Sequence, residues 1–102
     1  MKKKPTRPFH KTSQHLLKDP DVAAKYLEDI LADGNMELFT AALKDVADAR
    51  LGGMSALSKK TDLNREQLYK TLSKNGNPRL DTLSEVLHAV GLRMSVTPDA
   101  RM

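Results

Sequence analysis

Residues 53–91 read GMSALSKKTDLNREQLYKTLSKNGNPRLDTLSEVLHAVG and carry the most informative pattern of helices and turns in the chain. Apolar residues at helical spacing predict three pieces of helix, at residues 54–61, 65–73 and about 80–90. Each piece has only two or three turns, and such a helix is marginal in water on its own. The three pieces must therefore pack their apolar side chains together, and an all-α core is predicted.

The short link between the first two pieces predicts a helix-turn-helix over about residues 54–73. Leu57 is apolar and Ser58 after it is small, which lets the second helix cross close to the first. Asp62 lies where the chain reverses, and we expect a positive φ there, which Asp tolerates better than most residues. Asn64 is expected to cap the second helix, with Gln67 completing a capping box.

The second helix of the pair is expected to present a polar outer face. Leu68 and Leu72 point inward, so the opposite side faces solvent. An α-helix fits the major groove of DNA, where Arg pairs with guanine, Glu accepts from cytosine, and Tyr or Lys reaches phosphates or base edges. An alternative is that these side chains only solvate a helical bundle. The candidate DNA-binding residues are Ser55, Asn64, Arg65, Glu66, Gln67, Tyr69, Lys70, Ser73, Lys74, Asn75 and Arg79.

Two longer helices are predicted before this pair. The run Asp19-Pro20-Asp21 is a typical helix start, and the first helix should end near Gly34. The second should span residues 36–50. Their predicted core positions are Val22, Tyr26, Leu27, Ile30, Leu31, Phe39, Ala42, Leu43, Val46 and Ala47. Residues 1–18 carry two prolines and no periodic pattern, so we expect a flexible basic arm, then a domain over 19–98 and a tail over 99–102.

The C-terminal end of the domain has a different pattern. Residues 92–97 alternate between apolar and polar side chains until Pro98, which predicts a short β-strand. No second strand is evident in the sequence, so this strand should pair with a second copy or with the sheet edge of a partner. Gly91 is expected to cap the last helix in a left-handed conformation. We expect a homodimer whose interface includes Leu92, Met94 and Val96.

Charge divides the chain into blocks. Residues 1–18 carry six basic side chains and no acidic one, residues 19–49 carry eight acidic and two basic ones, and residues 50–93 carry eight basic and four acidic ones. A polyanion would be attracted to the arm and to residues 50–93. The acidic block either binds a basic partner or only solvates its helices.

Several function classes are excluded by what the sequence lacks. There is no cysteine, and the three histidines, His10, His15 and His88, show no metal-ligand spacing. Glu28 and Asp29 are adjacent and point in different directions on a helix, which is unsuitable for acid–base catalysis. We therefore expect no enzyme, no cofactor and no metal. No apolar run resembles a signal peptide or a membrane span, so a cytoplasmic protein without membrane contact is expected.

A family resemblance joins these features. From residue 19 to residue 97 the sequence resembles the HigA-type antitoxins, the addiction module antidote proteins of the XRE-like, phage-repressor-related helix-turn-helix class. The resemblance depends on Tyr26-Leu27, LFTAALKDVADAR at 38–50, Gly53-Met54-Ser55, LNREQLYK at 63–70, Leu72-Ser73, Gly76-Asn77-Pro78 and Gly91-Leu92-Arg93. Asp62 replaces the usual turn glycine, and Thr61 and Thr71 stand where apolar residues are common.

The resemblance implies a fold and a function. The fold would be a five-helix, phage-repressor-like bundle with a short C-terminal strand. The function would be that of a dimeric antitoxin of a type II toxin–antitoxin module, which binds a small basic toxin of the RelE/ParE superfamily (HigB-like) and represses its own operon on double-stranded DNA. Two alternatives stay open: a free-standing XRE-family regulator without a toxin, and a toxin-binding protein that has lost its affinity for DNA.

Overall fold

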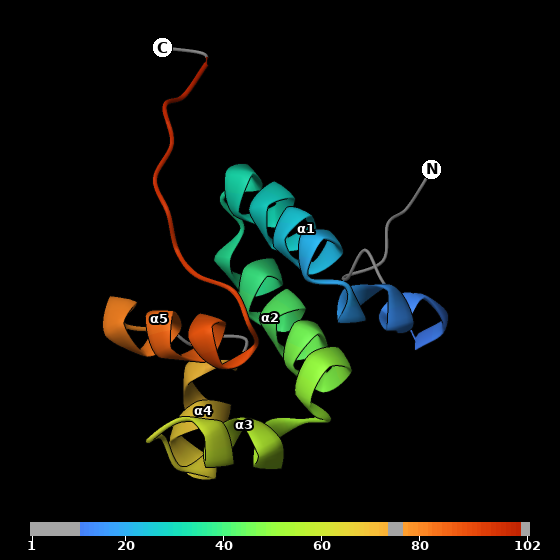
Figure 1. The fold of residues 1–102 in the computed structure, drawn as a ribbon. Coiled ribbons are helices and arrows are strands. Elements are labelled where there is room, and N and C mark those ends of the chain that lie inside the picture. Colours follow the sequence, from blue (N-terminus) through green and yellow to red (C-terminus); the bar gives the residue numbers. More distant parts are fainter. Residues whose placement is uncertain (1–10, 74–76, 101–102) are drawn as a thin grey trace.

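The computed structural model describes residues 11–73 and 77–100. Within these residues a 3-10 helix, η1 (Lys11–Lys18), precedes five α-helices (Figure 1), which confirms the expected all-α class with five α-helices for the described part of the chain. The α-helices are α1 (Pro20–Asp33), α2 (Met36–Leu51), α3 (Met54–Lys60), α4 (Arg65–Thr71) and α5 (Leu80–Ala89). Over the described ranges, none of these helices has both the length and the apolar character that crossing a membrane requires.

Local signals in the sequence set the limits of α1 and α2. The Asp19 carboxylate accepts a hydrogen bond from the Asp21 N–H at 2.8 Å, and Pro20 occupies the first turn of α1, as expected. Gly34 ends α1 with φ at 78°, a conformation that suits glycine. The Asn35 side chain then accepts from the Leu38 N–H at 3.0 Å and starts α2. The tight link makes α1 and α2 an antiparallel hairpin (Figure 1).

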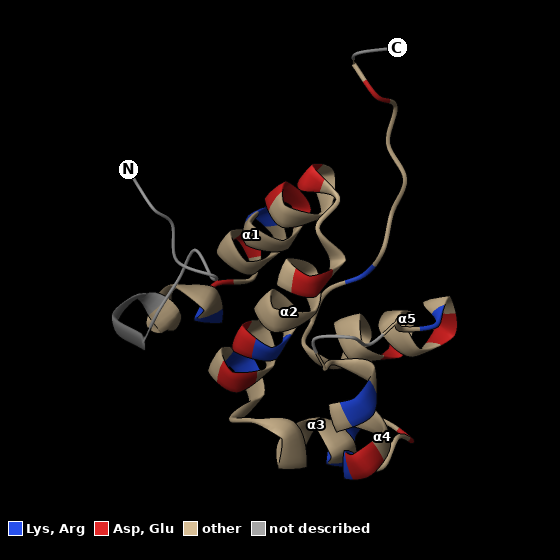
Figure 2. Ribbon diagram, turned by 180° about the vertical axis from the view of Figure 1, so that it is seen from behind, with Lys and Arg blue, Asp and Glu red and all other residues tan. Residues whose placement is uncertain are grey.

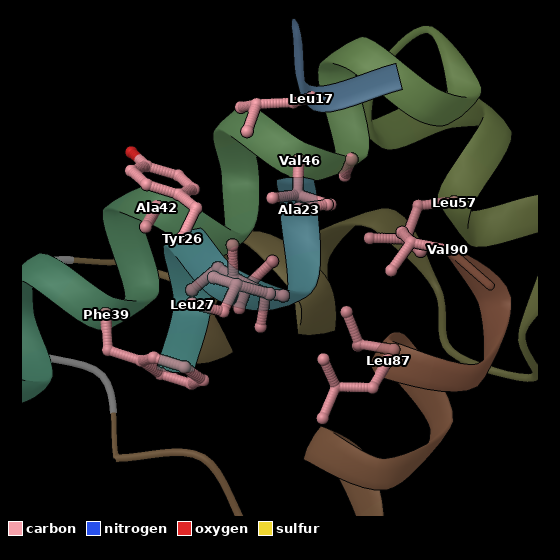
Figure 3. Packing of buried hydrophobic residues seen from close by; sticks show 14 of the residues in the cluster. Leu17, Ala23, Tyr26, Leu27, Phe39, Ala42, Val46, Leu57, Leu87 and Val90 are labelled. Carbon is pink, nitrogen blue, oxygen red and sulfur yellow. The ribbon is translucent and has the colours of Figure 1, made fainter. Parts of the chain in front are cut away.

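The core is built on this hairpin and continues into the shorter helices. Figure 3 shows side chains of α1 and α2 packed together, with Leu57, Leu87 and Val90 on the side of the later helices. All five predicted core positions of α2 are buried. On α1 the prediction was wrong for Leu31, which is 51% exposed, because burial needs another element over the side chain and none of the described elements covers it.

The N-terminal boundary of the domain was predicted too far along the chain. Residues 11–18, which were assigned to the flexible arm, form η1, and this helix packs against α1 and α2. Leu17 has no exposed surface and belongs to the core. A 3-10 helix lacks the 3.6-residue periodicity on which the sequence reading relied, so its apolar residue was missed. The rest of the predicted arm, residues 1–10, lies outside the described residues.

Arg50 connects the two ends of the domain. From the end of α2, its Nη1 donates to the backbone carbonyl of Lys18, at the end of η1, and its Nε donates to the carbonyl of Val90, at the end of α5. Gly91 lies so close that a Cβ placed on it would be 2.9 Å from Nη2 of Arg50. Hydrogen bonds from a charged donor are stronger than neutral ones, so Arg50 links the first and last helices through α2.

A buried polar pair lies inside the N-terminal half. The Tyr26 hydroxyl of α1 donates to the Asp45 carboxylate of α2 at 3.2 Å, and the two residues are 6% and 7% exposed. The Gln14 amide of η1 donates to the backbone carbonyl of Asp45 at 3.4 Å. These contacts fix the position of η1 and α1 on α2, because a buried carboxylate is stable only when it has partners.

The C-terminal segment was predicted as a strand, and in the single chain it is not one. Gly91 follows the end of α5 with a φ of 89°, which confirms the expected left-handed conformation, and the Leu92 N–H donates back to the Leu87 carbonyl at 2.8 Å. Residues 92–99 then have no regular secondary structure (Figure 1). A strand needs the backbone of a neighbour, and the described residues supply none. The exposed fraction rises to 38% at Met94 and 98% at Val96.

Candidate nucleic-acid interface

The candidate interface is formed by α3 and α4, which pack against each other at the end of the molecule away from the α1–α2 turn (Figure 1). Both helices have seven residues, so neither is stable without tertiary packing. Leu57 of α3 and Leu68 of α4 are completely buried, and Leu72 is 2% exposed. The inward positions of Leu68 and Leu72 agree with the prediction, and they leave the opposite side of α4 in solvent.

The turn between α3 and α4 is closed by hydroxyl groups, and here the prediction for Asp62 was wrong. Within the described chain no residue other than glycine has a positive φ. Instead, the Thr61 Oγ1 donates to the Leu57 carbonyl at 3.1 Å and accepts from the Leu63 N–H at 3.2 Å. The Ser58 hydroxyl donates to the Leu63 carbonyl at 2.8 Å. These bonds reverse the chain without the left-handed residue of the usual turn.

The first turn of α4 is capped as the sequence predicted. The side-chain oxygen of Asn64 accepts from the Gln67 N–H at 2.7 Å, which satisfies one of the free amides at the start of the helix. Both residues are exposed. The cap fixes where α4 begins, and with it the direction in which its outer side chains point.

The outer face of α4 carries four candidate side chains with different chemistry. Arg65, Glu66, Tyr69 and Lys70 are all exposed, and Tyr69 has 48% of its surface in solvent. Together they offer a guanidinium, a carboxylate, a phenol and an ammonium on one short helix. Base edges in the major groove present both donors and acceptors, so this set is chemically suited to them.

The other described candidates are Ser55, Ser73 and Arg79, and two of these already form contacts within the chain. Ser55 is exposed on α3, whereas Ser73 is half-buried and donates to the Lys70 carbonyl at 2.9 Å. Lys74 and Asn75 lie outside the described residues. At the start of α5, Arg79 forms a salt bridge with Asp81 at 3.1 Å, which the sequence reading did not foresee.

The Arg79–Asp81 contact affects the charge of both groups. A side-chain hydrogen bond from Arg79 and a backbone bond from Thr82 lower the pKa of the Asp81 carboxyl, and the same carboxylate raises the pKa of Arg79. Both side chains are largely exposed. Arg79 is therefore charged but already occupied by a carboxylate, which a phosphate would have to displace.

The distribution of charge is uneven between the two halves. Figure 2 shows acidic segments recurring along α1 and α2, whereas α4 carries both signs. The exposed charges of α3, α4 and their turn are those of Lys59, Lys60, Asp62, Arg65, Glu66 and Lys70. Positive charge is in excess on this surface, but the excess is modest. In residues 11–73 and 77–100, no three His, Asp or Glu side chains gather into a potential metal site.

The sequence reading missed two residues that shape this surface. Thr61 was noted only as a departure from an apolar position, although its hydroxyl closes the turn. A Thr two residues before Leu63, at the end of a helix, is a recognisable local signal for such a turn. The Asp81 partner of Arg79 is only two positions away, so a check of neighbouring charges would have found it.

Fold and surface together define a class of protein: a small domain, helical over its described residues, in which the capped short helix α4 packs against α3 and presents its polar face to solvent. The chain belongs to the family of probable addiction module antidote proteins, whose family model matches residues 6–98. An uncharacterized protein of Haemophilus influenzae (strain Rd) is 38% identical over 84 residues, which are 82% of this chain and 84% of that protein. No solved structure matches the chain. The expectation of an addiction-module antitoxin is confirmed at the level of the family.

Proposed function

We propose that this protein is a DNA-binding antitoxin of a type II toxin–antitoxin module, which neutralises a small basic toxin of the RelE/ParE superfamily (HigB-like) and represses its own operon. In this proposal α3 and α4 are an XRE-type helix-turn-helix, and α4 is the recognition helix. Membership of an antidote family supports the toxin partner. The exposed polar face of α4 supports binding to DNA, and it is the observation that carries the proposal.

Each outer side chain of α4 has a role in this proposal. Arg65 lies at the amino end of the helix, which points toward base edges when a recognition helix enters the major groove, so it is assigned a guanine. Glu66 accepts from a cytosine amino group, while Tyr69 and Lys70 reach phosphates or base edges farther along the groove. Glu66 also repels phosphates, so it contributes to specificity rather than to affinity.

Residues around α4 are assigned to the phosphate backbone. The oxygen of Asn64 is used by the helix cap, but its amide N–H groups remain available as donors. Gln67 beside it and Ser55 on α3 are exposed. The group assigned to phosphate contacts is Ser55, Asn64, Gln67, Ser73, Lys74, Asn75 and Arg79. Such contacts fix the register of the protein on DNA without reading sequence.

A dimer is part of this proposal because one recognition helix covers few base pairs. Two copies would read half-sites about 34 Å apart, one turn of DNA. The exposed side chains of Met94 and Val96, with the half-buried Leu92, are assigned to the contact between copies, and residues 92–97 form the strand only when they pair. Replacing both Met94 and Val96 by Asp is expected to give monomers in analytical ultracentrifugation; unchanged dimers would place the interface elsewhere.

The DNA half of the proposal is tested on the region upstream of the gene. Binding of the full chain to a fluorescent duplex of that region is measured by anisotropy over a salt series, with a shuffled duplex of the same length and composition as the control. We expect tighter binding to the upstream duplex and a loss of affinity with salt in both cases. Equal weak binding to both duplexes would favour an antitoxin that has lost its affinity for DNA.

The toxin half is tested on the neighbouring reading frame. The proposal expects a short gene for a basic protein beside this one, whose expression alone stops growth and whose toxicity ends when this chain is co-expressed. The two proteins are expected to co-purify. DNA binding without such a neighbour would favour a free-standing regulator of the XRE family.

A further inference from the structure

The α1–α2 turn forms a surface that the DNA-binding proposal does not use. We define the hairpin tip as residues 28–37, the last turns of α1, the link and the first residues of α2. Within the tip only Ile30 is buried, and every other residue is exposed. The tip lies at the opposite end of the molecule from α3 and α4 (Figures 1 and 2).

Two large apolar side chains of the hairpin tip are not covered by the domain. Leu31 is 51% exposed and Met36 is 42% exposed. Leu31 continues the buried stripe of Leu27 and Ile30, so its periodic position predicts burial, but no described element lies over it. Leu31 and Met36 stand on the two sides of a tight turn and give the tip two exposed apolar side chains, and Met adapts well to the surface of a partner.

The hairpin tip also carries four exposed acidic side chains. Glu28, Asp29, Asp33 and Glu37 are exposed, and the hairpin tip has no basic residue. Asp33 lies in the last turn of α1, where the negative end of the helix dipole disfavours a carboxylate. Of the four acids, Asp29 forms a salt bridge within the described residues, with Lys25 at 3.2 Å. Helix stability therefore does not explain the acid at position 33.

We infer that the hairpin tip is the docking surface for the basic toxin, with Leu31 and Met36 as apolar anchors and the four carboxylates as the rim. This inference rests on the proposed function for the identity of the partner. A protein that grips RNA presents positive charge, so the acids of the tip increase its association rate. The apolar pair then contributes the contact that slows dissociation.

The position of the hairpin tip has a consequence for repression. The tip and the outer face of α4 are at opposite ends of the domain, so toxin on the tip leaves α4 exposed. The toxin and the operator duplex therefore bind to one antitoxin at the same time. Addition of toxin to the preformed complex with DNA is expected to increase its mass rather than release the DNA.

The test compares matched surface variants of the full chain. The basic protein encoded beside the gene is purified and its binding to each variant is measured by biolayer interferometry. The apolar variant is Leu31→Ser/Met36→Ser, and the charge variant is Glu28→Gln/Asp33→Asn/Glu37→Gln. The control is Leu80→Ser/Glu85→Gln, which changes an apolar side chain that is 71% exposed and an exposed acid on α5. Binding to the upstream duplex shows that each variant is folded.

The outcomes separate this inference from the proposed function. The apolar variant is expected to bind the toxin at least about tenfold more weakly, mainly through faster dissociation. The charge variant is expected to associate about tenfold more slowly at low salt, with little difference at high salt. If the toxin binds the wild type and both tip variants equally, the docking surface is elsewhere and the inference fails. If it does not bind the wild type, the antitoxin proposal itself fails.

Discussion

The two halves of this domain are stabilised in different ways. Residues 11–51 form helices of 14 and 16 residues and a 3-10 helix, joined by a large apolar core and by the buried Tyr26–Asp45 pair. By contrast, α3 and α4 have seven residues each and are connected by a turn of local hydrogen bonds. The first half holds ten of the seventeen buried hydrophobic residues of the described chain, whereas the second half packs one face of the short α4 and leaves the opposite face exposed.

The same division appears in charge. The first half is acidic on its surface, and the second half has a modest excess of basic side chains around α4. Under the proposed function, the acidic first half repels a DNA duplex and the modest basic excess of the second half attracts it, so charge contributes to the orientation of the protein on the duplex. Changes in the first half should therefore alter stability and toxin binding, whereas changes in α3 and α4 should alter DNA binding.

The largest effect is expected where the halves are joined. Replacing Arg50 by Ala leaves the carbonyls of Lys18 and Val90 without their donor, and the buried Val90 carbonyl suffers most. We expect a loss of about 2–3 kcal/mol in the free energy of unfolding. Urea unfolding followed by circular dichroism measures this loss.

Two variants control for the Arg50 change. Arg50→Lys keeps the charge but reaches only one of the two carbonyls, so it should lose about half as much stability. Gly91→Ala places a methyl group near Arg50 and also strains a φ of 89°. Gly91→Ala should lower the free energy of unfolding by less in an Arg50→Ala background, because only the backbone strain then remains. A loss below about 0.5 kcal/mol for Arg50→Ala would show that the contact does not join the halves.

A smaller effect is expected from one hydrogen bond in each half. Tyr26→Phe removes the donor to Asp45, and Thr61→Val removes the hydroxyl that closes the α3–α4 turn. Each should lower the free energy of unfolding by about 1 kcal/mol. Only Thr61→Val should also weaken binding to the upstream duplex, by roughly fivefold, because it changes where α4 begins. Equal DNA affinity for the two variants at 15 °C would contradict the division of roles.

The parts of the structure set by neighbouring residues were predictable from the sequence. The caps at Asp19, Asn64 and Gly91 depend on side chains or backbone within a few positions, and all three were predicted. The inward face of α4 also followed, because Leu68 and Leu72 repeat at helical spacing. Local chemistry therefore fixed the element limits and the outward side of the candidate site.

The predictions that were wrong or missing concern residues whose environment is not set by their neighbours in the sequence. Leu31 has the periodic position of a core residue, but burial depends on whether another helix reaches it. Asp62 was assigned a positive φ, yet the hydroxyls of Ser58 and Thr61 close the turn in another way. Arg50 bonds to residues 32 and 40 positions away, and no local pattern reveals such contacts. Tertiary contacts and competing turn chemistry decided these positions.

The smallest expected effect concerns the acid stability of the second half. The pKa of Asp81 is lowered in the folded chain, first by the hydrogen bond from Arg79, so its contribution to stability is present above the unfolded pKa. It is lost as the pH falls through the folded pKa, below about pH 4. Asp81→Asn should therefore flatten the decline of unfolding free energy in this acid range and change little at pH 7, because the salt bridge is exposed. An unchanged acid profile in urea titrations would contradict this assignment.

The proposed binding of DNA by the outer face of α4 is tested by comparing two double variants with wild type. Anisotropy titrations on the upstream duplex compare wild type with Arg65→Ala/Lys70→Ala and with Lys25→Ala/Lys44→Ala, which removes two positive charges from α1 and α2 instead. We expect the α4 variant to lose at least about thirtyfold in affinity and to show a shallower salt dependence, while the α1–α2 variant binds like wild type. If the α4 variant binds the duplex as tightly as wild type does, DNA is not bound by the outer face of α4.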